Sequence, residues 1–491
     1  SIGSPFKQRQ HSKVFSHILF NAVLSLNLGL SLLNCVSLKN KGYRVVLAHF
    51  ERYNVSIDEL NKFFNITELS KNQLEWLSYQ VNRISFFEKL RLYLYLAYCV
   101  NSDELYQKVF GEIRDAVLDS NKDFIKYKND IKIKQSSVKV DLPLRVNFGG
   151  GWSDTAPHCL ENGGTVLNAS IKLNGECPVH VKIDKIKERK IIFESQDMGV
   201  YGEFDNLKEL QNTGDPYDSF ALQKSALISI GLIPQTGGNF DDIIDRLGGG
   251  FKIDSEVIGV PKGSGLGTSS ILSCAVIKAL FEFFGLENNE NMLYQTVLVM
   301  EQIMSTGGGW QDQIGGATDG FKFMYSKPGI KQDIVVEHLN LSDKVLDEIN
   351  NRFVLIYTGE RRLARNLLRD VIGRYLGNIK ESVEAHKNIK VLATKMRDAL
   401  INENVEEFIK LYNQHYSESL KIDHESTNSL IDNIFMSIED LIDAKMIIGA
   451  GGGGFVGAFM KKNVTKDKIH NRLKEVFLDF PVDVWESCFT K

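Results

Sequence analysis

A glycine-rich loop with several hydroxyl side chains is the stretch of this chain best suited to bind a charged ligand. It reads GVPKGSGLGTSS over residues 259–270 and leads into the apolar run ILSCAVIKALFEFF. Apolar residues recur there at the helical period, which predicts a helix over 268–284 with one buried face. A helix start presents unpaired N–H groups and a partial positive charge, and glycines let a ligand approach the main chain. The loop is therefore predicted to hold phosphate groups.

The loop differs from the two commonest nucleotide-binding motifs. The Walker pattern GxxxxGK[ST] is absent, and no βαβ unit surrounds the loop as the dinucleotide fingerprint requires. The alternative interpretation is a capped helix that follows a flexible turn. The hydroxyl groups at 268–270 indicate a magnesium ligand, because this hard cation takes few protein oxygens and shares its other positions with water and phosphate.

Two carboxylates follow the loop in the segment NMLYQTVLVMEQIMSTGGGWQDQIGG, residues 291–316. The apolar period predicts a helix that carries Glu301 and is broken at glycines 307–309. Glu301 could complete a magnesium shell, and Asp312 could receive the proton of an attacking hydroxyl, as carboxylates often do in phosphoryl transfer. An Asp near a helix start is a weak base, but a loose transition state asks mainly for orientation. The alternative for Glu301 is a solvated helix carboxylate.

An earlier motif, PLRVNFGGGWSDTAP, supplies groups that could hold a sugar. It reads as a strand followed by a tight loop, with Arg145 and Asp154 on either side of glycines 149–151. An Asp at a glycine-opened bend can accept two hydrogen bonds from vicinal hydroxyls, and Trp152 could offer an apolar face to a ring. The alternative is that Asp154 only caps a turn.

A fourth glycine cluster lies near the end of the chain, in KMIIGAGGGGFVGAFM. Glycines 449, 451 and 454 satisfy GxGxxG, but FVGAFM resembles a strand rather than a crossover helix, and too little chain follows for a dinucleotide-binding domain. A glycine-tipped hairpin that closes on the active site fits better. A dinucleotide-dependent oxidoreductase is disfavoured for the same reason.

The elements that must position these motifs change in type along the chain. Before about residue 130 there is no glycine cluster, and the patterns from Ser56 onward are helical. From Val138 the runs VKVDLPLRVNF, CPVHVKI and KIIFES predict strands. We therefore predict a mainly helical region over 1–135, a part with the first three motifs over 136–350, and a final part of helices and paired strands over 351–491.

The composition is that of a globular protein without a global charge bias. Of the 491 residues 43% are hydrophobic and 24% are charged, with a net charge of −4, so neither nucleic acid nor a membrane is the expected partner. The six cysteines are scattered without a CxxC pair, which favours a reducing, cytoplasmic location. The apolar run Ile18–Val36 is interrupted by three asparagines and is read as a buried core segment rather than a membrane span.

In this order the four motifs resemble those of the GHMP sugar and metabolite kinases. Within that family, GGGWSDTAP together with YTGERRLARNLL (residues 357–368) is similar to the L-fucokinase branch, which is close to the heptose-phosphate kinases. Galactokinases have Glu-His before Thr-Asp where this chain has Gly-Trp-Ser-Asp, which argues against galactose. A helical region before the kinase part resembles bacterial bifunctional enzymes in which a guanylyltransferase domain lies upstream.

The resemblance implies a two-lobed α+β fold, with a mixed-sheet lobe and a ferredoxin-like lobe, preceded by the mainly helical region. ATP and Mg²⁺ are the implied ligands, and a homo-oligomer is compatible with the family. The implied nucleotide-binding residues are Gly263, Ser264, Gly265, Leu266, Gly267, Thr268 and Ser269. The implied metal ligands are Ser269 and Glu301, the catalytic residues Asp312 and Arg145, and the sugar-binding residues Asp154, Trp152, Gly151 and, at the rim, Arg362.

The activity that the resemblance implies is ATP-dependent phosphorylation of the anomeric hydroxyl of L-fucose. The product would be fucose 1-phosphate, in the salvage route to GDP-fucose. Two alternatives stay open: a heptose-phosphate kinase of the same family, and a sensor that binds sugar and ATP without turnover. A substrate with its own phosphate should need a basic pocket, which the sequence does not plainly show, and a sensor has no need of Glu301 and Asp312.

Overall fold

The computed structural model describes residues 84–215, 217–304, 307–360 and 365–491. The chain divides into two compact units, and the described part of the smaller one comprises residues 84–112 and 371–384. The larger comprises the described residues of 113–370 and 385–491. The core segment expected over Ile18–Val36, and the helices expected to begin near Ser56, lie outside the described residues.

Helices supply the described part of the smaller unit. Helix α6 (Phe86–Val100) begins at a capping box, in which the Ser85 hydroxyl accepts from the Glu88 N–H and the Glu88 carboxylate accepts from the Ser85 N–H. Helix α7 (Asp103–Ser120) starts in this unit, and Lys89 Nζ lies 2.9 Å from Glu112 Oε2. Helices α16 (Arg365–Leu376) and α17 (Lys380–Ile401) each have one end here.

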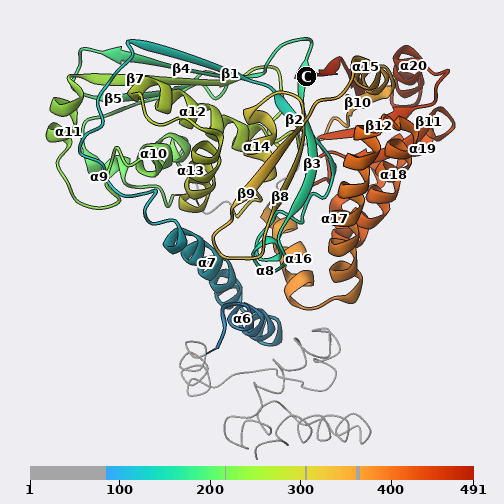
Figure 1. Cartoon of the computed structure of the whole chain (residues 1–491), viewed down its shortest axis with the longest axis horizontal. Coiled ribbons are helices and arrows are strands. Elements are labelled where there is room, and N and C mark those ends of the chain that lie inside the picture. Colours follow the sequence, from blue (N-terminus) through green and yellow to red (C-terminus); the bar gives the residue numbers. More distant parts are fainter. Residues whose placement is uncertain (1–83, 216, 305–306, 361–364) are drawn as a thin grey trace, which may run out of the picture. The chain divides into compact units, whose positions relative to one another are not determined.

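The larger unit contains a mixed five-stranded sheet in the order β1-β4-β7-β5-β6, in which only β5 and β7 pair in parallel (Figure 1). Its strands are β1 (Ser137–Leu142), β4 (Val179–Ile186), β7 (Gly250–Val257), β5 (Ile191–Ser195) and β6 (Val200–Phe204). Helix α12 (Thr268–Phe284) packs on this sheet, and α10 (Ala221–Ser229) and α13 (Glu290–Ile303) pack on α12. The strands expected from Val138 onward are confirmed.

Two antiparallel sheets complete the larger unit. One has the order β14-β3-β8-β9 with β2 paired to β3, and the other has the order β11-β12-β10-β13. The first consists of β2 (Leu144–Gly149), β3 (Thr165–Leu173), β8 (Phe321–Ser326), β9 (Ile334–Leu339) and β14 (Ser487–Phe489). The second consists of β10 (Phe353–Tyr357), β11 (Ile442–Ile447), β12 (Phe455–Met460) and β13 (Asp483–Trp485). Mixed and antiparallel sheets with helices confirm the α+β class.

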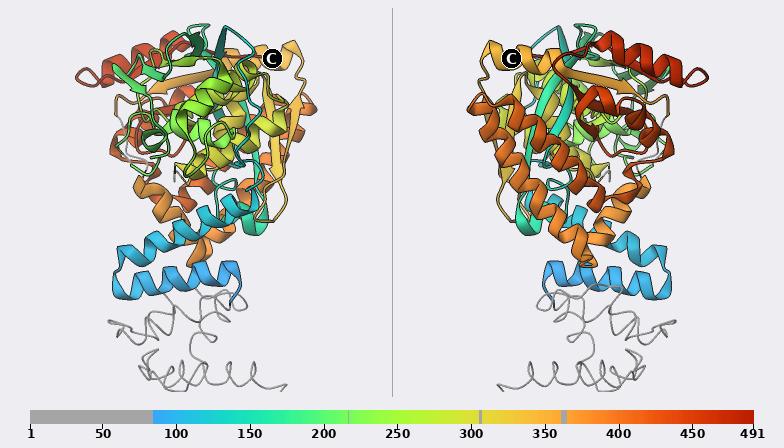
Figure 2. Two further views of the ribbon diagram at one scale, coloured as in Figure 1. Left: turned by 90° about the vertical axis from the view of Figure 1, so that its left-hand side faces the viewer. Right: turned by 90° about the vertical axis from the view of Figure 1, so that its right-hand side faces the viewer.

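The larger unit also contains the helices α8, α9, α11, α14, α15, α18, α19 and α20. Helix α18 packs on β11, and α19 contacts α20. Figure 1 shows α18, α19 and α20 beside β10, β11 and β12, and both views of Figure 2 show red helices of the C-terminal segment in the upper part of the picture. Their bounds are α8 (His158–Asn162), α9 (Leu207–Leu210), α11 (Phe240–Leu247), α14 (Gln311–Ala317), α15 (Asp343–Arg352), α18 (Val405–Ile422), α19 (Ser429–Ser437) and α20 (Lys466–Val476). Within the described ranges, no helix has the length and apolarity needed to cross a membrane.

Phe148 joins the two antiparallel sheets at the point where the first motif loop begins. Its fully buried ring stacks on Phe321 of β8 at 5.4 Å between centroids and meets Phe353 of β10 at 6.1 Å. It also lies 5.3 Å from the ring of Phe408 on α18. Aromatic pairs at these separations add to the free energy of burial. The loop of glycines 149–151 therefore begins directly after a residue that is fixed in the aromatic core.

Candidate active site

The glycine-rich loop ends at a helix start that is open to a ligand. Helix α12 begins at Thr268, and its N-cap is Gly267, whose φ is 78°. Gly263 and Gly265 also have left-handed backbone, with φ of 73° and 81°, which disfavours residues with a side chain. No side chain of the described residues caps this helix, so its first N–H groups point to the loop. The predicted helix and its bounds are confirmed.

The loop packs against the fourth glycine cluster. Strands β11 and β12 pair antiparallel, so residues 448–454 form the tip of a hairpin, as predicted. The Phe455 N–H donates to the carbonyl oxygen of Ser264 at 3.0 Å. A Cβ at Gly265 would collide with the carbonyl oxygen of Ile448, and one at Gly454 would collide with that of Ser264. Because a strand follows the GxGxxG pattern, the dinucleotide interpretation is wrong.

Arg145 connects the loop to Asp312. From β2 its guanidinium donates to Asp312 Oδ1 through Nε at 2.9 Å and through Nη2 at 2.6 Å, and Nη1 donates to the carbonyl oxygen of Gly265 at 2.9 Å. The Arg145 side chain is 4% exposed, whereas that of Asp312 is 28% exposed. Asp312 therefore keeps access to a ligand while one of its oxygens is held in place.

The Arg145–Asp312 pair lies beside the start of α12. A Cβ placed on Gly267 would lie 3.3 Å from Arg145 Nε and 3.4 Å from Asp312 Cβ. Helix α14, which carries Asp312 in its first turn, packs on α12. The structure thus brings together the predicted phosphate loop and both predicted catalytic residues.

Glu301 is buried on α13 rather than solvated. It is 3% exposed, and its Oε2 lies 3.4 Å from the position of a Cβ on Gly308. Burial raises the pKa of the Cys274 thiol on α12, and the negative charge of Glu301 adds to that rise, which places the carboxylate near this helix. The alternative of a solvated carboxylate is wrong.

The oxygen donors of Ser269 and Glu301 are of the chemical type that magnesium prefers. Ser269 is exposed on the first turn of α12, next to the open glycine loop, and the buried Glu301 supplies an anionic oxygen donor. Across the described ranges, no group of three or more His, Cys, Asp and Glu side chains is arranged to hold a metal ion. An ion that takes two protein oxygens and completes its shell with water and phosphate needs no such group.

Asp154 is buried, and it binds Gln311. It is 1% exposed, its Oδ2 accepts from the Gln311 N–H, and its Oδ1 accepts from Gln311 Nε2, both at 3.0 Å. Burial raises the pKa of Asp154 to about 7, while the Gln311 N–H opposes this rise and the negative charge of Asp312 adds to it. Both carboxylate oxygens of Asp154 therefore already accept hydrogen bonds from Gln311.

The rest of the first motif loop has unusual backbone. Trp152 is half-buried with a φ of 77°, and a Cβ on Gly151 would lie 3.3 Å from Gln311 Nε2. The Ser153 hydroxyl donates to the carbonyl oxygen of Gly150 at 2.6 Å. Gly151, Trp152 and Asp154 therefore lie within one tightly held turn. Arg362 lies outside the described residues.

His415 holds this turn from α18, a role that the sequence did not indicate. The Gly150 N–H donates to His415 Nε2 at 2.7 Å, and His415 Nδ1 lies 3.2 Å from the Ser419 hydroxyl. An Nε2 that accepts must carry no proton, so the proton of the neutral ring is on Nδ1. His415 is 1% exposed, and burial lowers its pKa to about 4.

This contact predicts acid sensitivity. Because the pKa of His415 is about 4 in the folded protein and about 6.5 when unfolded, the unfolded chain binds more protons between these values, and the free energy of unfolding falls as the pH decreases through them. We expect a contribution of about 2 kcal/mol between pH 7 and pH 5. Urea unfolding of the wild type and of His415→Gln at both pH values measures it. Gln can still accept from Gly150 but does not titrate, so equal losses in both proteins would contradict the prediction.

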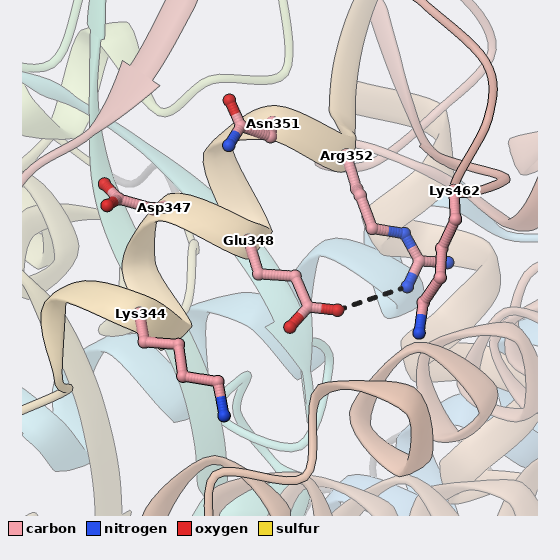
Figure 3. A pocket seen from close by; sticks show the side chains of 6 residues that line it. All are labelled: Lys344, Asp347, Glu348, Asn351, Arg352 and Lys462. Atoms are coloured by element: carbon pink, nitrogen blue, oxygen red, sulfur yellow. Dashed lines mark ion pairs between the residues drawn. The ribbon is translucent and has the colours of Figure 1, made fainter.

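An open pocket of about 520 Å³ lies away from these residues, on α15. Figure 3 shows the side chains that line it, which are Lys344, Asp347, Glu348, Asn351, Arg352 and Lys462. The Arg352 guanidinium is engaged by Glu406, Asp443 and the carbonyl oxygen of Met460. The pocket contains none of the predicted site residues, and its lining carries three basic and two acidic side chains.

Comparisons with known proteins identify the family of this chain. The sequence model described as the GHMP kinases N terminal domain matches residues 237–320. The chain is 37% identical over 354 residues to a bifunctional fucokinase/GDP-fucose pyrophosphorylase of Arabidopsis thaliana, covering 72% of this chain and 32% of that protein. It is 30% identical over 386 residues to an L-fucokinase/L-fucose-1-P guanylyltransferase of Bacteroides fragilis, covering 75% and 39%. The chain thus spans about a third of the length of these two relatives.

Two further likenesses bear on the class of protein. A D-glycero-alpha-D-manno-heptose 7-phosphate kinase of Campylobacter jejuni is 29% identical over 328 residues, covering 66% of this chain and 89% of that protein. The structure of Lactococcus lactis galactokinase superposes with a TM-score of 0.54 at 17% identity, covering 72% and 94% of the two chains, which shows the shared fold. The fold and the motifs are those of a class of kinases that phosphorylate small molecules. The chain belongs to the GHMP kinase superfamily.

Proposed function

We propose that this protein is an ATP-dependent sugar kinase that phosphorylates the anomeric hydroxyl of L-fucose. The observation that carries the proposal is the Arg145–Asp312 pair beside the first turn of α12, with Arg145 also bound to the phosphate loop at Gly265. A carboxylate held next to a phosphate cradle is the arrangement that orients a hydroxyl for in-line attack. A sensor without turnover would have no use for it.

Each residue has a separate task in the proposed reaction. The N–H groups of Gly263–Ser269 hold the phosphates of ATP, and Asp312 orients the sugar hydroxyl and accepts its proton. The hydroxyl oxygen bonds to the γ-phosphorus as the bond to the β,γ-bridging oxygen breaks, and ADP leaves. Arg145 holds Oδ1 of Asp312 in place through two hydrogen bonds and stabilises charge on the transferred group. Magnesium, held by Ser269 and Glu301, would neutralise phosphate charge when bound.

The choice of L-fucose rests on the two bifunctional relatives, whose names include fucokinase and whose identities are 37% and 30%. The heptose 7-phosphate kinase relative, at 29%, keeps a second candidate in view. A phosphorylated sugar needs a cationic pocket, and among the residues that the structure describes, the cation shown beside Asp312 is Arg145, which is already bound to Asp312 and Gly265. On the described residues alone, this favours a neutral sugar.

A coupled assay of ADP release tests the proposal. L-Fucose, D-galactose, D-mannose and a heptose 7-phosphate are compared at equal concentration with Mg-ATP, and the product is identified by ³¹P NMR. We expect the highest kcat/KM with L-fucose and a product phosphorylated at the anomeric oxygen. Turnover with the heptose phosphate alone would reassign the substrate. If the protein binds ATP but turns over none of the four sugars, the alternative of a sensor without turnover would be favoured.

The metal assignment makes its own prediction. Ser269→Ala removes one of only two protein oxygens proposed for magnesium, so we expect the Mg²⁺ concentration for half-maximal activity to rise about tenfold, with kcat largely recovered at saturating Mg²⁺. Ser270→Ala, on the neighbouring residue of the same helix turn, serves as the control. Identical Mg²⁺ titrations of wild type and Ser269→Ala would reject Ser269 as a ligand.

A further inference from the structure

Gln311 lies between two carboxylates: Asp312, which the proposed function uses, and Asp154, for which the family resemblance implies sugar binding. It is the first residue of α14, directly before Asp312, and it binds the buried Asp154 through both its main-chain N–H and its side-chain amide. Resting on the proposed kinase function, we propose that Gln311 is a positioning residue that makes the placement of Asp312 depend on Asp154. Asp154 then acts on turnover through α14 and not only as a ligand for sugar hydroxyls.

The hydrogen bonds define the first turn of α14 from two sides. The first N–H groups of a helix have no partner within the helix, and here the Asp154 carboxylate satisfies that of Gln311, as an N-cap side chain would. The Asn168 amide on β3 donates to the carbonyl oxygen of Gln311 at 3.1 Å. The main-chain N–H and carbonyl oxygen of Gln311 are therefore both held by neighbouring elements, and Asp312 follows directly in the chain.

The packing around these groups leaves little room for adjustment. A Cβ on Gly309 would collide with Asp154 Oδ2, and a Cβ on Gly315 would lie 2.6 Å from Asn168 Nδ2 and 2.9 Å from Arg145 Cβ. Glycines thus allow the carboxylate, the helix and the arginine to approach one another closely. A shift of Asp154 must therefore move the start of α14, and with it the carboxylate that Arg145 binds.

The charges around Asp154 also couple it to α14. Asp154 and Asp312 repel one another, and burial of Asp154 raises its pKa, whereas the Gln311 N–H and the charge of Arg145 favour its ionised form. An ionised carboxylate accepts hydrogen bonds on both oxygens, which is the pattern seen with Gln311. Gln311 therefore supports Asp154 while Asp154 fixes the backbone of Gln311.

The experiment separates a positioning role from a sugar-binding role by steady-state kinetics with L-fucose and ATP. Gln311→Met keeps the length of the side chain and the main-chain N–H but removes the amide donor. We expect its kcat to fall about tenfold while both KM values stay within about twofold of wild type. Asp154→Asn should also lower kcat, and the double variant should be no slower than Asp154→Asn alone, because the two act through one link.

Gln313→Met is the matched control on the same helix. Gln313 is fully buried, and neither polar atom of its side chain has a hydrogen-bond partner among the described residues. We expect its kcat to stay within about twofold of wild type. Equal losses in Gln311→Met and Gln313→Met would overturn the proposal, as would a higher sugar KM with unchanged kcat in Asp154→Asn.

Hydrogen exchange supplies a readout that needs no turnover. The peptide covering residues 307–320 should exchange faster in both Gln311→Met and Asp154→Asn than in wild type, and at the wild-type rate in Gln313→Met. Wild-type exchange in the first two variants would show that no such link exists. If the wild type phosphorylates none of the tested sugars, the proposed function fails, and the exchange data still decide the link between Asp154 and α14.

Discussion

Replacing Asp312 by Asn should lower kcat by roughly 10³-fold, within the range of about 10²–10⁴ that general acid–base groups contribute. Asn is nearly isosteric and can still accept from Arg145 through its oxygen, so the loss isolates the charge and basicity of the carboxylate. ATP affinity should change less than about threefold, because the phosphates are held by main-chain N–H groups. Stopped-flow kinetics with L-fucose and a fluorescent ATP analogue measure both quantities.

The neighbouring Asp319 provides the control for this prediction. It is exposed just beyond the other end of α14, and its Oδ1 accepts from the Thr490 hydroxyl at 3.0 Å. Asp319→Asn should leave kcat unchanged. A kcat near the wild-type value in Asp312→Asn would remove Asp312 from the mechanism, and comparable losses in both variants would show that the effect is not specific to Asp312.

Replacing Gly265 by Ala should weaken ATP binding by about 100-fold or more. The residue has a φ of 81°, and an added Cβ would collide with the carbonyl oxygen of Ile448 in the hairpin. The backbone strain alone costs roughly 1–2 kcal/mol, and the collision cannot be relieved by a side-chain rotation because both groups are main chain. The loop must therefore move, and its carbonyl oxygen must leave Arg145. Isothermal titration with an ATP analogue measures the effect.

Gly175 separates strain from collision. Its φ of 79° matches that of Gly265, but a Cβ there would meet nothing within 4 Å. In Gly175→Ala the free energy of unfolding should therefore fall only by the cost of the backbone strain, and this variant should bind the nucleotide as the wild type does. If Gly265→Ala binds the analogue as tightly as Gly175→Ala does, the loop is not the nucleotide cradle.

Features that depend on local sequence were predictable. The helix start at Thr268 follows from a glycine-rich turn before an apolar period, and α12 ends at Phe284 with Gly285 in the left-handed conformation. The hairpin at 448–454 follows from glycines between two apolar runs, and its antiparallel pairing is confirmed. In each case a few adjacent residues decide the conformation.

Contacts between distant segments were not predictable from local patterns. Arg145 and Asp312 are separated by 167 positions, and only the family resemblance suggested that they meet. The bonds of Asp154 to Gln311 and of His415 to Gly150 depend on side-chain placement after the sheets have packed. His415 lies in an ordinary helical segment, YNQHYSES, and nothing in its neighbours distinguishes it from a core histidine.

The interlocking of the phosphate loop with the hairpin has a consequence for how the protein is made. The carbonyl oxygen of Ser264 is bound by the N–H of Phe455, and Gly454 packs directly on Ser264. A ribosome therefore finishes the loop long before it synthesises the segment that supports it. The contacts that support the loop therefore form late in translation, only after residues 454 and 455 have left the exit tunnel.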